Sequence, residues 1–177
     1  MNWLKRLMRA QRGSGLEPLK VVELPARSLY GEHWSLSGMN VPSAKSEDAA
    51  VYLPGRNVLL TSLAAIVCVP RGYSQIAIGV LAHNPFGDAT PEFFRSMGGS
   101  LSAALGKKVR IAAPLAGMTK DALIRAAARI RLELTFSCLA PVGVRHCGRC
   151  NKCAERRRAF KRCGRPDPTR YVRSQQI

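Results

Sequence analysis

The apolar residues of the chain fall into short segments separated by turn-forming residues, and their spacing predicts alternating helices and strands. Residues 2–11 have the spacing of an amphipathic helix, and Pro18 to Leu24 has the composition of a short strand. The polar stretch from about Pro25 to Ala50 is rich in Ser, Gly and Pro, which is typical of a long irregular loop.

The second half of the chain alternates more regularly. The apolar segment from Val58 to Val69 predicts a buried helix, and Gln75 to Leu81 predicts a buried parallel strand because both of its faces are apolar. Pro91 suits the first turn of a helix that runs to about Leu105, even though two glycines weaken its middle. Another strand is expected at 108–113, and Thr119 is the expected N-cap of a helix that ends near Arg131. This alternation predicts an α/β fold with a parallel sheet, built as a single domain over residues 1–177.

The bulk composition is that of a globular protein, but the charge is not. The chain has 177 residues, of which 46% are hydrophobic and 22% are charged, and its net charge is +17. Such a field attracts nucleotides, pyrophosphate, nucleic acid or a membrane surface without choosing among them, and a solvated basic surface is the alternative explanation. The opening residues lack the apolar run of a signal peptide, and Val58 to Val69 is too short to span a bilayer. We therefore expect a cytoplasmic protein without a membrane partner, in which cysteines bind metal or stay free.

Four of the six cysteines have the spacing of a metal site. Cys147, Cys150 and Cys153 form two successive C-x-x-C steps, and Cys138 lies upstream at the end of a short strand-like segment. Gly148 gives the backbone freedom for a tight turn, and Cys153 falls near the start of a helix that runs to Arg162. These residues predict one structural Zn²⁺ with four thiolate ligands, in a loop and helix spanning residues 138–163, because four protein ligands leave no open position for catalysis.

Other interpretations of these cysteines fit the spacing less well. An iron–sulfur cluster also uses thiolates, but the spacing matches neither common ferredoxin pattern. A redox C-x-x-C pair leaves the other cysteines unexplained. His146 could replace one thiolate, although Cys147 has the better spacing, and Cys68 and Cys163 are expected to be bystanders.

The helix after the cysteines is strongly basic. Its Lys and Arg side chains could face the phosphates of RNA or could simply form a solvated face. The residues concerned are Lys152, Arg156, Arg157, Arg158, Lys161 and Arg162.

Several motifs, taken in order with the cysteine set, give the chain a family resemblance. It resembles the 7-cyano-7-deazaguanine synthases of queuosine biosynthesis, a family in the PP-loop ATPase superfamily, over about residues 16–171. The motifs are Leu53-Pro54-Gly55-Arg56-Asn57, Gly79-Val80, Asp88-Ala89-Thr90-Pro91-Glu92-Phe93, Met118-Thr119-Lys120, Thr135-Phe136-Ser137-Cys138, the segment from Cys147 to Cys153, and Pro166-Asp167-Pro168.

The resemblance implies a Rossmann-like fold of the adenine nucleotide alpha-hydrolase type, with a zinc element near its carboxyl end. It implies an ATP-dependent ligase that uses Mg²⁺ and ammonia to convert the carboxylate of 7-carboxy-7-deazaguanine to a nitrile. By the family pattern Arg56 and Asn57 lie at the active-site mouth, and Asp88 and Glu92 border the deazapurine pocket. From the residues alone, Arg56 could equally pair with a surface acid, and Asp88 and Glu92 could be ordinary turn and first-turn acids.

The chain departs from the family pattern in one important respect. The family begins with a strand and a phosphate loop of the form Ser-Gly-Gly-x-Asp-Ser, and no such motif occurs in this sequence. Ala89-Thr90 also replaces a Cys-Arg pair that many members have, so substrate contacts could differ, and Asn84-Pro85-Phe86 before the Asp could mark a branch that acts on a related carboxylate. The preferred expectation is a chain that is truncated at its N-terminus relative to the family and inactive alone. The alternatives are a non-catalytic, zinc-containing basic module that binds RNA, and a chain that pairs with a separate loop-bearing subunit or with its own copy.

Overall fold

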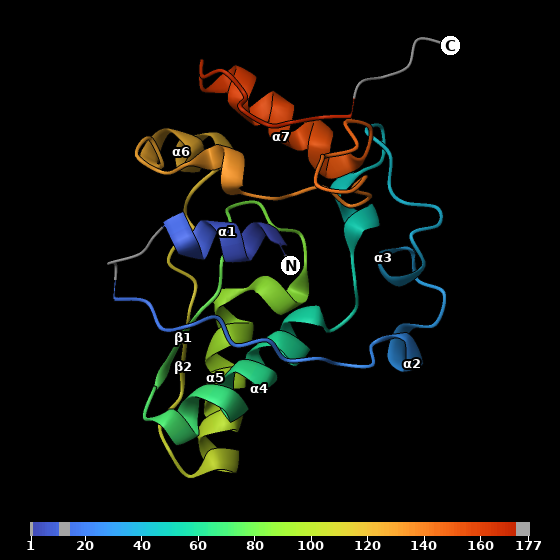
Figure 1. The fold of residues 1–177 in the computed structure, drawn as a ribbon. Coiled ribbons are helices and arrows are strands. Elements are labelled where there is room, and N and C mark those ends of the chain that lie inside the picture. The colour runs from blue at the N-terminus through green and yellow to red at the C-terminus, as the bar shows by residue number, and fades with distance from the viewer. Residues whose placement is uncertain (1, 11–14, 173–177) are drawn as a thin grey trace. The chain divides into compact units, whose positions relative to one another are not determined.

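The computed structural model describes residues 2–10 and 15–172, and these divide into two compact units (Figure 1). One unit extends from Tyr52 to Leu123, and the other combines the residues up to Val51 with those from Ile124 onward. The helices are α1 (Asn2–Ala10), α2 (Arg27–Tyr30), α3 (Trp34–Ser37), α4 (Arg56–Cys68), α5 (Pro91–Leu105), α6 (Lys120–Ala126) and α7 (Asn151–Arg162). The strands are β1 (Gln75–Ala77) and β2 (Arg110–Ala112), and short 3₁₀ turns occur at Asp48–Val51, Val69–Arg71, Gly87–Ala89 and Leu132–Leu134.

The Tyr52–Leu123 unit is built on a parallel pair of strands. β1 and β2 are joined through α5, and Ile76 of β1 lies opposite Ile111 of β2 in the ladder. α4 and α5 pack beside this pair (Figure 1). Because parallel strands need a crossover connection, the β1–α5–β2 order confirms the α/β class expected from the sequence. The core consists of Ala65, Val69, Val80, Ala89, Phe94, Leu101, Val109 and Ile111.

The bounds of α5 follow from local sequence signals. Thr90 is the N-cap, and its hydroxyl accepts a hydrogen bond from the backbone N–H of Phe93 at 3.1 Å. Pro91 occupies the first turn, and Gly106 ends the helix in the left-handed conformation with φ of 62°. Gly98 does not break the helix, because it lies where α5 approaches β2. A Cβ at Gly98 would stand 3.1 Å from the carbonyl oxygen of Val109, a tight contact that would push α5 and β2 slightly apart.

The other unit contains α7 and the cysteine-rich loop before it. The buried side of α7 includes Ala159 and Phe160, which pack with Ile124. The two stretches of chain that make up this unit meet at the cysteine-rich loop. Ser43 forms an isolated antiparallel bridge with Cys150, and the N–H of Asn151 donates to the carbonyl of Pro42 at 2.9 Å. These main-chain bonds tie residues 42–46 to the start of α7.

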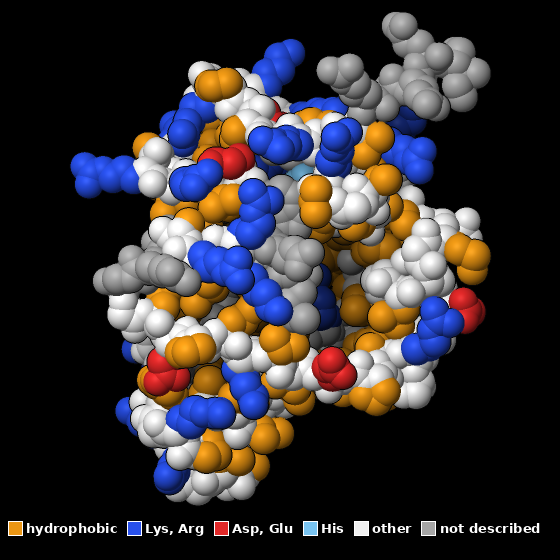
Figure 2. Space-filling model, viewed as in Figure 1, with side chains coloured by type: hydrophobic (Ala, Val, Ile, Leu, Met, Phe, Trp, Pro, Cys, Tyr) orange, Lys and Arg blue, Asp and Glu red, His pale blue; other side chains and the backbone are white. Residues whose placement is uncertain are grey.

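Positive charge is concentrated in this second unit. Residues up to 51 and from 124 onward include 21 Lys and Arg against eight Asp and Glu, whereas residues 52–123 include seven against three. Lys and Arg side chains are spread over the face shown in Figure 2, with few acidic side chains among them.

No helix among the described residues is long and apolar enough to cross a membrane.

Several expected elements are wrong or too long. Residues 18–24 form no strand, and Val21 and Val22 are more than 40% exposed, because their high strand propensity has no neighbouring strand to pair with. The expected loop at 25–50 contains two one-turn helices and a 3₁₀ turn. β1 covers only three of the seven residues expected, and the helix after Thr119 ends at Ala126.

Candidate metal centre and other candidate sites

Four cysteine sulfurs converge in the unit that contains α7. The sulfurs of Cys138, Cys147, Cys150 and Cys153 all lie within 4.8 Å of one another. The sulfurs of Cys147 and Cys153 are 4.0 Å apart, and those of Cys138 and Cys150 are also 4.0 Å apart. Four sulfurs at 2.3 Å from a zinc ion would stand about 3.8 Å from each other in a tetrahedron. The donor set therefore fits a four-coordinate thiolate metal site.

The positions of these sulfurs follow from the local backbone. Gly148 has a φ of 77°, a backbone conformation that residues with a side chain rarely adopt, and it allows the tight turn between Cys147 and Cys150. Cys150 is the N-cap residue of α7, and Cys153 lies in the first turn of the same helix. The cysteine spacing in the sequence was enough to predict this convergence, although the segment before Cys138 is a 3₁₀ turn and irregular chain instead of a strand.

Backbone N–H groups point at three of the sulfurs. The N–H of Cys147 donates to the Cys138 sulfur at 3.2 Å, and the N–H of Leu139 donates to the Cys150 sulfur at 3.4 Å. The N–H of Arg149 donates to the Cys147 sulfur at 3.5 Å. Such bonds stabilise a thiolate, which is the form that binds metal.

Burial and these bonds act on the thiol pKa values in opposite directions. Burial raises the pKa of Cys138 to about 11, despite the N–H of Cys147, and it also raises that of Cys153. Burial opposes ionisation of Cys147 too, but backbone N–H groups outweigh it and lower its pKa to about 7. Without a metal, the thiols of Cys138 and Cys153 therefore stay protonated, and a divalent cation would have to displace their protons.

His146 does not join the sulfur cluster. Its ring is fully buried, and its Nε2 accepts a hydrogen bond from the N–H of Ser137 at 3.2 Å. An accepting Nε2 carries no proton, so the geometry requires the neutral ring. Burial, together with the charge of Arg156, lowers the pKa of His146 to about 4. The ring packs between Phe136 and Tyr171, with centroid distances of 4.6 Å and 5.9 Å.

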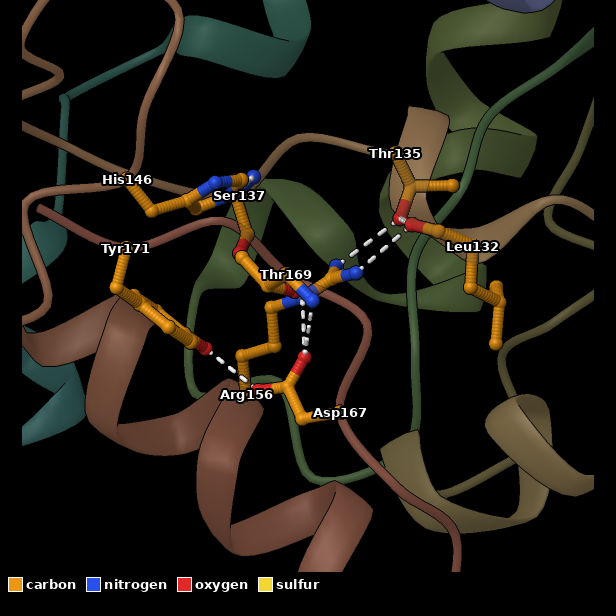
Figure 3. Close-up of polar contacts among 8 residues, drawn as sticks. All are labelled: Leu132, Thr135, Ser137, His146, Arg156, Asp167, Thr169 and Tyr171. Carbon is orange, nitrogen blue, oxygen red and sulfur yellow. Dashed lines mark hydrogen bonds and ion pairs between the residues drawn. The ribbon is translucent and has the colours of Figure 1, made fainter.

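A buried arginine connects α7 to the segments on either side of the cysteines (Figure 3). The guanidinium of Arg156 donates to the hydroxyls of Thr169 at 2.6 Å and Thr135 at 3.0 Å, and to the carbonyl of Leu132 at 2.9 Å. It also lies 3.9 Å from a carboxylate oxygen of Asp167. Burial lowers the pKa of Arg156, but Asp167 acts in the opposite direction and supports its charge.

Asp167 completes this network. Its carboxylate accepts from the hydroxyl of Tyr171 at 2.6 Å and from the N–H of Thr169 at 3.0 Å. The hypothesis that Arg156 and Lys152 face phosphates is therefore wrong. Arg156 points inward, and the ammonium of Lys152 is paired with Asp48 at 3.3 Å and Glu155 at 2.8 Å.

The four predicted substrate residues lie in the Tyr52–Leu123 unit. The carboxylate of Asp88 accepts from the backbone N–H of Asn57 at 2.9 Å, and the Asn57 side-chain amide donates to the carbonyl of Asp88 at the same distance. Asn57 is 2% exposed, so its side chain is committed to this pair. Arg56 and Glu92 are exposed first-turn residues of α4 and α5. The structure thus brings Asn57 and Asp88 together and leaves two charged side chains accessible.

A cavity opens at the carboxyl end of β2 in the same unit. Its volume is about 390 Å³, and its lining includes Pro91 and Phe94 of α5, Arg110 of β2 and Ala113 just beyond that strand. The first turn of α5, which contains Glu92, contributes to its wall through Pro91. Ligands of α/β sheets commonly bind beyond the carboxyl ends of the strands, as this cavity would allow.

Comparison with known proteins gives this arrangement a family. The sequence model of queuosine biosynthesis protein QueC matches residues 11–164. A 7-cyano-7-deazaguanine synthase of Myxococcus xanthus is 32% identical over 187 residues, covering 97% of this chain and 81% of the relative. The synthase of that name from Pseudomonas fluorescens is 33% identical, with 95% and 80% coverage. A third, from Methanocaldococcus jannaschii, is 29% identical, with 89% and 77% coverage. The chain therefore belongs to the queuosine biosynthesis protein QueC family.

Proposed function

We propose that this chain is part of an ATP-dependent 7-cyano-7-deazaguanine synthase. The observation that carries the proposal is the match to synthases of that name over nearly the whole chain, together with the four converging cysteines. The reaction would convert the carboxylate of 7-carboxy-7-deazaguanine to a nitrile, with ammonia as the nitrogen source. A carboxylate is a poor electrophile, so adenylation by ATP and Mg²⁺ would supply a leaving group, and nearby cations would offset the phosphate charge.

The metal in this proposal is a structural Zn²⁺ held by Cys138, Cys147, Cys150 and Cys153. Sulfur separations of 4.0 Å support it, since they approach the edge of a zinc–thiolate tetrahedron. Bound there, the ion would contribute folding energy and would have no open position for substrate. Its role would be to fasten the loop 138–150 to the first turn of α7.

The residues proposed for the substrate site are Arg56, Asp88 and Glu92, which would face the substrate, and Asn57, which lies behind them. Asn57 would act as a positioning residue, because its buried amide holds the loop that contains Asp88. Carboxylates can accept hydrogen bonds from the amino and ring N–H groups of a guanine-like edge, which suits Asp88 and Glu92. The exposed guanidinium of Arg56 is suited to an anionic group such as a carboxylate or phosphate.

ATP use in this proposal depends on a phosphate loop that the 177-residue sequence does not contain. No Ser-Gly-Gly-x-Asp-Ser motif occurs in it. We therefore expect the chain alone to bind the deazapurine but not to turn it over, with the loop supplied by further sequence or by another subunit.

The test is a product assay. The chain is incubated with ATP, Mg²⁺, ammonium and 7-carboxy-7-deazaguanine, alone and together with a polypeptide that carries the phosphate loop. AMP and the nitrile are measured by liquid chromatography and mass spectrometry. We expect product from the combination only, and loss of substrate binding in Glu92→Gln but not in the exposed control Glu47→Gln.

Two results would count against the proposal. The proposed function would be refuted if no combination released AMP in response to the deazapurine and calorimetry detected no binding of 7-carboxy-7-deazaguanine. Nitrile formation by the chain alone would keep the function and overturn the expected need for a separate loop.

A further inference from the structure

The outward side of α7 is a continuous basic surface. Four residues at positions i, i+1, i+4 and i+5 of the helix are exposed, and all four are basic. We call this surface the α7 basic face; it consists of Arg157, Arg158, Lys161 and Arg162. In Figure 2, the region where α7 lies in Figure 1 shows closely spaced Lys and Arg side chains.

The charge of the surrounding chain adds to that of the helix. Residues 145–170 include ten Lys and Arg against two Asp and Glu. Both of these acids are already engaged, since Glu155 pairs with Lys152 and Asp167 lies in the Arg156 network. Within residues 145–170 basic side chains therefore outnumber acidic ones five to one. Asp48, outside this segment, also lies close enough to Arg158 for their charges to interact.

One member of the face is held in place. The guanidinium of Arg157 donates to the carbonyl of Gly148 at 2.9 Å and stacks over the ring of Tyr171 at 4.0 Å. Since Gly148 belongs to the cysteine-rich turn, Arg157 is anchored to the cysteine cluster. A side chain held this way loses less conformational entropy when it binds an anion.

The opposite side of α7 decides which partner fits. Cys153, Ala159 and Phe160 are at most 2% exposed, so the apolar side of α7 is not available for insertion into a lipid surface. Protein interfaces are depleted of charge at their centre, whereas nucleic-acid interfaces are polar and strongly positive. Arginine also matches phosphate geometry with two parallel hydrogen bonds.

The spacing fits a phosphate backbone. Side chains four residues apart on a helix have Cβ atoms about 5–6 Å apart, so Arg157 with Lys161, and Arg158 with Arg162, form two short rows along the axis. Each row can contact phosphates along a strand without reading bases.

We propose that the α7 basic face binds the phosphodiester backbone of nucleic acid. This inference does not depend on the synthase activity, because it concerns a surface of another unit than the predicted substrate residues. Four phosphate contacts would give a slope of about −3 to −4 in log K against log salt. A fourfold rise in salt would then weaken binding about 100-fold.

The test compares two charge-reversed variants by fluorescence anisotropy with a labelled RNA hairpin. Arg158→Glu/Lys161→Glu changes the face, and Lys107→Glu/Lys108→Glu makes the same change of net charge at exposed residues of the other unit. We expect the first to weaken binding at least tenfold and to reduce the salt slope by about 2, and the second to change affinity less than threefold. Circular dichroism and metal content should match the parent in both.

Three results would overturn the proposal. One is an equal loss of affinity in the two variants, which would mean a response to net charge alone. Another is no salt-dependent binding of the hairpin by the parent chain. The third is binding of anionic vesicles or polyglutamate as tightly as RNA. A DNA duplex of the same sequence should bind with a similar salt dependence, because the α7 basic face contacts phosphates and reads no bases.

Discussion

Replacing Arg156 tests how the unit that contains α7 is held together. Arg156→Met keeps an unbranched apolar stem at this position but removes the guanidinium. That group makes three hydrogen bonds, to Thr169, Thr135 and Leu132, and one ion pair to Asp167. The variant therefore leaves several acceptors unpaired on both sides of the cysteine-rich loop.

The size of the effect follows from burial. The side chain of Arg156 is 9% exposed and that of Asp167 is 17% exposed, so water cannot easily replace the lost partners. Removing one member of a buried ion pair costs about 3–5 kcal/mol. For a chain of this size that loss lowers Tm by about 10 °C. The Tm of Arg156→Lys should lie between those of the parent and Arg156→Met, because lysine keeps the charge but cannot reach three acceptors in different directions.

The assay is differential scanning calorimetry at equal metal content. Arg158→Met is the matched control, since it makes the same chemical change at an exposed residue of the same helix, where the effect should stay within about 0.5 kcal/mol. If Arg156→Met melted at the same temperature as Arg158→Met, the buried network would not stabilise this unit and the reasoning would be refuted.

Three further predictions concern other contacts. Asp88→Ala should lower the free energy of unfolding of the Tyr52–Leu123 unit by about 0.5–2 kcal/mol, because the Asp88 carboxylate accepts an N–H at the start of α4. Urea unfolding measures this change, and the control variant Glu92→Ala should not show it. Gly99→Ala should stabilise α5 by about 0.5–1 kcal/mol. Gly98→Ala should not, because the new Cβ at residue 98 would meet the carbonyl oxygen of Val109 at 3.1 Å. Equal changes in melting temperature for the two variants would contradict this contact. His146 has a folded pKa of about 4 against 6.5, so the unfolded chain binds more protons below pH 6.5 and stability should fall from there towards pH 4. An unchanged acid limb in His146→Asn would argue against this origin.

The elements that the sequence predicted well have their signals within a few residues. The helix from Pro91 to Leu105 has Thr90 before it and Gly106 after it, and both act as the caps that their residue types suggest. The cysteine set was predictable for the same reason, since two C-x-x-C steps around a glycine constrain the backbone locally. Local chemistry was sufficient in these cases.

The elements that failed depend on distant partners. Val21 and Val22 favour a strand, but a strand must pair with a neighbouring strand. The sequence of residues 18–24 does not reveal that this partner is missing among the described residues. Arg156 was assigned outward with its neighbours because composition alone does not say which side of a helix is buried. A signal was present, since Arg156 lies three residues from Cys153 and four from Phe160, on the side that both bury.

The most direct test of the account is the metal content of the purified chain. Inductively coupled plasma mass spectrometry should find about one zinc per chain, and Cys150→Ala or Cys153→Ala should remove it and unfold the loop before α7. Cys68→Ala, outside the sulfur cluster, should keep the metal. A parent chain without tightly bound metal, or a Cys150→Ala variant that keeps both metal and fold, would contradict the claim that these four sulfurs hold one structural ion.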